Sequence, residues 1–210
     1  MGSFDEKIIE PMINRFVYGL FYPAILGANL ILLIQRAGAD WTITSLFVWD
    51  EIVIGLAWIL TLLLFIFDYV GTATDGVCGA PCRASWTALL DLLAAAIFFY
   101  AQAKLLNENI VQIKDISWDD LWFCLLFLHI LYALWYIVRL VQTPELLSDK
   151  SKKYIKYVHR QMLAIFIQIS LFGLVSWFCG ISNSWTYVVV CVISIIGWFV
   201  RQGIEYKYTD

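Results

Sequence analysis

Charged residues are scarce in this sequence. Of its 210 residues, 15% are Asp, Glu, Lys or Arg, against about 25% in a typical soluble domain. The hydrophobic fraction is 61% and the mean hydropathy is +0.77. A soluble fold of this size has too few charges here to cover so much apolar surface. The composition therefore excludes an ordinary soluble enzyme and a disordered tail, and it indicates a membrane protein.

Residues that carry chemistry are also few. The chain has two histidines, and it contains no His-Glu-x-x-His, no Gly-x-Ser-x-Gly and no phosphate-binding loop. Its five cysteines do not supply the two ligand pairs of a structural zinc site. We therefore expect no enzymatic activity, no metal and no cofactor. Because the net charge is −3, we also expect no nucleic-acid partner.

Six apolar stretches approach the length of about 20 residues that a membrane-spanning helix needs. They cover residues 16–35, 46–67, 86–103, 121–141, 161–181 and 185–200. Of all the charged residues, only Asp50, Glu51, Asp91 and Arg139 fall inside them. A charge at the centre of a bilayer costs roughly 2.5–3.5 kcal/mol on insertion scales, so this partition is typical of spanning helices. The sequence predicts one all-α transmembrane domain over residues 1–210 with six spans. Four spans with two half-inserted segments are the alternative.

The loops predict how the chain is oriented. Eleven Lys and Arg residues fall on the side of both termini, and three, Arg36, Lys104 and Lys114, fall on the other side. Positive residues accumulate in cytoplasmic loops. We therefore expect both termini in the cytoplasm and the protein in a plasma membrane or a bacterial inner membrane.

The segment 142–160 is the most basic part of the chain. Thr143-Pro144-Glu145 is typical of a helix start. The basic residues that follow are Lys150, Lys152, Lys153, Lys156 and Arg160. Aromatic and aliphatic residues interrupt them, which favours a helix lying on the cytoplasmic membrane surface in contact with anionic lipids. A docking site for a cytosolic protein partner and a simple orientation signal are the alternatives.

Polar residues within the spans predict an outer layer. Asn29, Asp50, Glu51 and His129 fall at similar depths, counted at 1.5 Å per residue. If the first, second and fourth spans are neighbours, these residues form a site for a cation or a proton. Alternatively, the two carboxylates mark the water boundary and His129 makes one structural hydrogen bond.

A second, inner layer holds Asp91, Gln168, Arg139 and Asp68. An Asp91–Arg139 pair would neutralise both charges and be structural. Asp91 as an inner relay is the functional interpretation.

Two functions fit these patterns. The first is a small oligomeric channel or transporter for a cation, proton or small solute, which uses Asn29, Asp50, Glu51, His129 and Asp91. The alternative is a non-enzymatic membrane sensor or scaffold that recruits a cytosolic partner through residues 142–160. Because the spans leave no room for a soluble domain, we expect a homo-oligomer or a heteromeric complex surrounded by membrane lipids.

Overall fold

A computed structural model describes residues 17–40, 49–75, 84–106, 116–142 and 149–209. Every regular element in these ranges is a helix, and none of the described residues forms a strand. The elements are η1 (Val17–Phe21), α2 (Tyr22–Asp40), α3 (Trp49–Asp75), α4 (Ala84–Leu105), α5 (Trp118–Gln142), α6 (Asp149–Cys179) and α7 (Ser184–Thr209). The predicted all-α class is confirmed over this part of the chain.

Within the described part of the chain, five helices are long and apolar enough to cross a membrane. Their candidate spans are Ile52–Gly71, Thr87–Leu105, Trp118–Val138, Ile155–Cys179 and Ser184–Ile204. A sixth apolar stretch, Gly19–Gln35 of α2, is shorter. Each of the six apolar stretches predicted from the sequence therefore corresponds to one helix, and the protein is an integral membrane protein.

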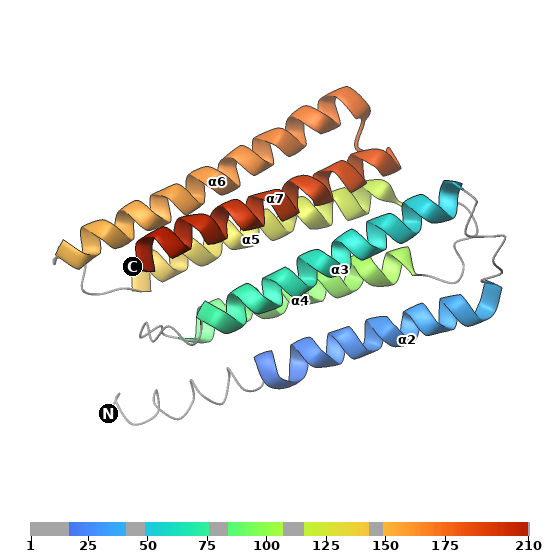
Figure 1. Cartoon of the computed structure of the whole chain (residues 1–210), viewed down its shortest axis with the longest axis horizontal. Coiled ribbons are helices and arrows are strands. Elements are labelled where there is room, and N and C mark those ends of the chain that lie inside the picture. The colour runs from blue at the N-terminus through green and yellow to red at the C-terminus, as the bar shows by residue number, and fades with distance from the viewer. Residues whose placement is uncertain (1–16, 41–48, 76–83, 107–115, 143–148, 210) are drawn as a thin grey trace.

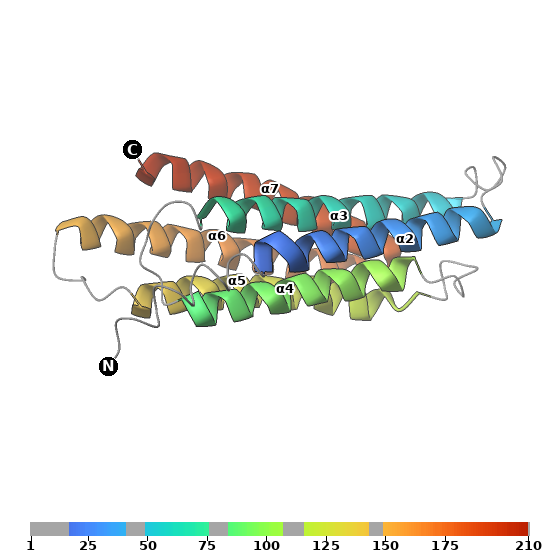
Figure 2. The ribbon, with the colours of Figure 1, turned by 90° about the horizontal axis from the view of Figure 1, so that it is seen from below.

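Four of the helices form a ring. α3 packs against α4 and α7, and α5 packs against the same two helices. α2 lies outside this ring against α4, and α6 lies outside it against α5 and α7 (Figure 1 and Figure 2). We name α3, α4, α5 and α7 the four-helix core. Side chains that point inward from these four helices share one interior.

Small and aromatic side chains fill the middle of this interior. Ala57 on α3 and Ala95 on α4 are completely buried, and small residues let membrane helices approach closely. The Phe65 and Phe98 rings meet edge to face, with their centroids 5.7 Å apart. The centre of the four-helix core is therefore filled by apolar side chains.

A tight turn joins α6 to α7. Gly180 follows the last residue of α6 and has a φ of 78°, a conformation that glycine adopts at no steric cost. The Thr186 hydroxyl donates to the Gly180 carbonyl at 2.7 Å, and the Trp185 amide donates to the Asn183 side chain at 2.9 Å. This turn joins the last two predicted stretches, 161–181 and 185–200. We name this end of the bundle the hairpin end and the opposite end the far end (Figure 1).

The basic segment differs from its prediction. We expected a separate surface helix at 142–160, but α6 is one continuous helix of 31 residues from Asp149 to Cys179. Residues 149–160 contain no Gly or Pro to end a helix, so the basic residues form the first turns of the spanning helix itself. The expected helix start at Thr143 lies outside the described residues.

Gln168 ties α6 to α7. Its Nε2 donates to the carbonyls of Ile193 and Ser194, both at 3.4 Å. A Cβ on Gly197 would overlap the Gln168 side chain. Gly197→Ala should therefore push Gln168 away and destabilise the protein by about 1–3 kcal/mol, the usual cost of overpacking. Thermal melting in detergent, followed by tryptophan emission, measures the change.

Gly203→Ala is the matched control for this prediction. Gly203 lies on the same helix, and a Cβ there would meet nothing within 4 Å. We expect this variant to melt at or slightly above the wild-type temperature, because Ala favours helix more than Gly does. Equal melting temperatures for the two variants would show that the Gln168 contact does not hold α6 against α7.

Candidate functional site

Each helix of the four-helix core places one ionisable side chain in the same buried region. The residues are Asp68 on α3, Asp91 on α4, Tyr132 on α5 and Arg201 on α7. Asp68, Asp91 and Arg201 are 6%, 5% and 8% exposed. Charges inside spanning helices are costly and usually mark function. We name these four residues, together with Tyr22 and Gln161, the charged cluster; it lies in the far-end half of the bundle.

The Asp68 carboxylate is at the centre of the charged cluster. The Tyr22 hydroxyl donates to Asp68 Oδ2 at 2.9 Å, and the Tyr132 hydroxyl also hydrogen-bonds this carboxylate. The positive charge of Arg201 attracts it from α7. Two phenol donors and one guanidinium therefore compensate for the water that a buried carboxylate loses.

A local irregularity in the first helix positions Tyr22. Pro23 has no N–H to donate to the preceding turn, and its ring crowds that turn. The chain forms a π-helical turn, Val17–Phe21, immediately before α2. Tyr22 follows this turn and stacks on Phe65 with ring centroids 5.3 Å apart. Its hydroxyl oxygen also lies 3.3 Å from the Asp91 backbone carbonyl oxygen. A peripheral helix thus contributes a hydroxyl to the core.

Asp91 and Arg201 interact with residues on three other helices. The Asp91 carboxylate interacts electrostatically with the Tyr22 and Tyr132 phenols. The Arg201 guanidinium lies 4.7 Å from the centroid of the Tyr132 ring, in cation–π geometry. Gln161 Nε2 on α6 donates to the Arg201 backbone carbonyl at 3.0 Å. The cluster therefore links all six long helices.

His129 lies beside the charged cluster. Its Nδ1 is 2.8 Å from the Leu125 carbonyl, which only accepts hydrogen bonds, so Nδ1 carries the hydrogen. In the neutral ring, Nε2 is then a proton acceptor, and it has no hydrogen-bond partner among the described residues. The ring packs edge-on against Phe172 and Tyr132, with centroids 4.7 and 5.8 Å away. His129 is therefore a buried imidazole whose ring lies against Tyr132.

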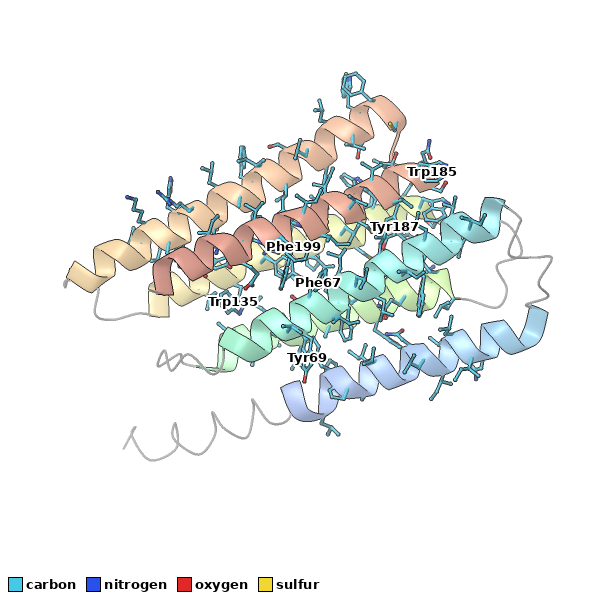
Figure 3. All side chains as sticks on the ribbon, in the orientation of Figure 1. Phe67, Tyr69, Trp135, Trp185, Tyr187 and Phe199 are labelled. Atoms are coloured by element: carbon cyan, nitrogen blue, oxygen red, sulfur yellow. The ribbon has the colours of Figure 1, made fainter. Side chains whose placement is uncertain are left out.

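A second polar group lies in the hairpin-end half. The Thr61 hydroxyl is 2.7 Å from the Ala57 carbonyl, to which it donates. The Tyr187 hydroxyl is 2.8 Å from the Thr61 oxygen and is therefore the donor in that pair. Cys191 hydrogen-bonds both residues. Figure 3 shows Tyr187 on α7, between the middle of the bundle and its hairpin end.

Phe65 separates the two polar groups on α3. It lies between Thr61 and Asp68 in sequence and packs against Phe98 of α4. Polar side chains therefore stand on both sides of an apolar waist formed by Phe65 and Phe98.

The structure does not bring the predicted outer layer together. Asn29 is completely buried on α2, which packs against α4, whereas His129 faces Phe172 of α6. The first, second and fourth spans meet at Asp68, which hydrogen-bonds Tyr22 and Tyr132. Neither the Asn29 amide nor His129 Nε2 has a hydrogen-bond partner among the described residues. The side chains of Asp50 and Glu51 lie outside the described residues, so their role stays a prediction.

The remaining predicted residues divide into two groups. Lys156 is exposed and Arg160 is half-buried near the start of α6. The side chains of Lys150, Lys152, Lys153 and Arg139 lie outside the described residues. The Asp91–Arg139 pair therefore stays a prediction, and the basic residue that the described structure places near the acidic groups is Arg201.

Sequence reasoning missed Arg201, Tyr22 and the Thr61–Tyr187 pair. The predicted sixth span ends at residue 200, and Arg201 falls just outside it, among the basic residues on the side of the termini. A periodic signal was present, because Tyr187, Ser194 and Arg201 recur every seven residues. Thr61 and Asp68 on α3 have the same spacing. Seven residues are two helical turns, so each set shares one face.

Comparisons with protein-family models, with curated proteins and with solved structures found no match to this chain.

Proposed function

We propose that this protein is a small membrane transporter or channel that moves protons, and that the charged cluster is where the proton is held. The observation that supports this is the convergence of one ionisable side chain from each core helix on one buried region. Packing alone does not require it, since apolar residues of similar volume are often as stable as a buried ion pair. Intramembrane carboxylates and histidines are typical of proton relays.

The chemistry of the charged cluster favours a proton over a metal cation. The Arg201 guanidinium acts on the Asp68 carboxylate and repels a second cation there. Carboxyl, phenol and imidazole groups each take up and release a proton in place. Tyr132 hydrogen-bonds Asp68 and lies against the His129 ring. We therefore place Tyr132 between the Asp68 carboxylate and the His129 ring in the proposed path.

We assign the other part of the proton path to the hairpin-end half of the bundle. The Thr61–Tyr187 pair and Cys191 offer hydroxyl and thiol groups beyond the Phe65 waist. Gln102 on α4 is completely buried, and neither of its amide atoms has a hydrogen-bond partner among the described residues. Movement of the aromatic waist would connect the two halves in turn, as alternating access requires.

The placement in the membrane follows from the charge distribution. The basic residues 150–160 lie at the far end, so the positive-inside rule puts that end in the cytoplasm. The charged cluster is then on the cytoplasmic side, with both termini, and α2 crosses as a sixth span. We place the protein in a plasma membrane or a bacterial inner membrane as a homo-oligomer.

Flux in liposomes tests this proposal. Purified protein is reconstituted, a pH gradient is imposed, and a trapped pH-sensitive dye reports proton entry. Na⁺ and K⁺ dyes run in parallel. We expect proton entry to exceed that of protein-free liposomes, with no matching Na⁺ or K⁺ signal. Proton entry at the protein-free rate would contradict the proposal.

A recruiting scaffold is the second candidate, because the start of α6 projects past α5 and α7 at the far end (Figure 1). This basic end is accessible to a cytosolic protein. The same preparation separates the two candidates. Absence of flux together with a partner that co-purifies in mild detergent would favour the scaffold.

A further inference from the structure

A groove of about 470 Å³ runs between α6 and α7. Its walls include Leu163 and Ile167 of α6 and Ile196 and Val200 of α7. Each of these four side chains is about half exposed, so the groove opens on the outer, membrane-facing surface of the bundle. Its volume lies within the range of about 300–1,000 Å³ that is usual for small-molecule sites.

Small residues make the groove, and one cation lies near its end. Ala164 and Gly197 both line it and leave room that larger side chains would fill. Arg160, towards the far end of α6, also lines it. Lys156, one turn earlier, is exposed. Arg160 is five residues into the candidate span Ile155–Cys179, about 8 Å along the helix, close to the level of lipid headgroups.

We propose that this groove binds one anionic phospholipid, with an acyl chain along the apolar walls and the phosphate at Arg160 and Lys156. The charge of the two basic residues matches a phosphate, and the apolar walls match a hydrocarbon chain. A second copy of this chain fits less well, since α6 packed against α6 would bring two basic helix starts together. The site is independent of the proton path.

Native mass spectrometry of the purified full chain tests the proposal. The protein in mild detergent is titrated with dioleoyl-phosphatidylglycerol or with dioleoyl-phosphatidylcholine, which has the same acyl chains and no net charge. We expect one phosphatidylglycerol to bind several-fold more tightly than phosphatidylcholine. Equal affinities would contradict a site that recognises the anionic headgroup.

Two variants locate the site. Arg160→Gln should weaken phosphatidylglycerol binding about fivefold, because a basic residue near the surface contributes about 1 kcal/mol. Lys104→Gln, which removes a charge at the hairpin end, should leave phosphatidylglycerol binding unchanged.

Ala164→Phe should fill the groove and remove the tight site. Ser170→Phe, which adds the same bulk at an exposed position of α6 outside the groove, should not.

Each result has a defined meaning. Wild-type phosphatidylglycerol affinity in Arg160→Gln or in Ala164→Phe would overturn the proposal. A change of oligomer mass in Ala164→Phe, with the lipid count unchanged, would overturn it in favour of a second copy of the chain. If Ala164→Phe fails to fold, Ile167→Trp fills the groove from its exposed rim and is expected to behave in the same way.

Discussion

Replacing Asp68 with Asn is expected to reduce proton flux in liposomes to the level of protein-free vesicles. The Asp68 carboxylate accepts hydrogen bonds from the hydroxyls of Tyr22 and Tyr132, and Arg201 attracts it. An amide has nearly the same shape but cannot take up a proton. The hydrogen bond between α3 and Tyr132 would therefore lose its proton-binding member, the Asp68 carboxylate. Dye-reported proton entry measures the effect.

Asp120→Asn is the control for this variant. Asp120 is an exposed carboxylate in the first turn of α5, at the hairpin end. The substitution makes the same chemical change outside the charged cluster, so flux should stay at the wild-type rate. Proton entry in Asp68→Asn at the rate of Asp120→Asn would place the path elsewhere in the bundle.

The second large effect is on stability and depends on which charges remain. Asp68→Asn leaves the Arg201 guanidinium, which cannot give up its proton, without its acidic neighbour on α3. We expect a loss of about 3 kcal/mol, the scale of an uncompensated buried charge. Arg201→Gln should cost less, because the carboxyl that remains can become neutral by taking up a proton. Melting in detergent, followed by tryptophan emission, measures both changes.

The double variant Asp68→Asn/Arg201→Gln should be more stable than Asp68→Asn alone. With both charges removed, two amides face the phenols of Tyr22 and Tyr132, and no isolated charge is buried. A double-mutant cycle isolates this coupling. Purely additive losses would show that Asp68 and Arg201 do not depend on each other.

Most of the fold could be predicted from the sequence, because each long apolar stretch corresponds to one helix. The residues close to a helix end decide where the helix stops. The tight turn after Cys179, for example, depends on Gly180 and Asn183. Apolar length and turn residues both lie within one segment of the chain, so predicting them requires no knowledge of contacts between helices. The error at 142–160 has the same origin, since a run of basic residues predicts a surface location but does not end a helix.

The candidate site was predicted less well because it depends on contacts between helices. The sequence places Asp68 and Asp91 within or at the ends of spans but does not say that α2 packs against α4. Nor does it show that Pro23 and the turn before it direct Tyr22 toward Asp68. His129 was correctly singled out as a buried residue, but its neighbours are Tyr132 and Phe172 rather than Asn29.

The most direct test of the charged cluster is proton flux through the Asp68→Asn/Arg201→Gln double variant. This variant removes both charges, and its melting temperature is measured on the same preparation. A loss of flux in a variant that melts near the wild-type temperature is not due to unfolding. We predict proton entry at the protein-free rate. Entry at the wild-type rate in this folded variant would contradict a proton path through Asp68.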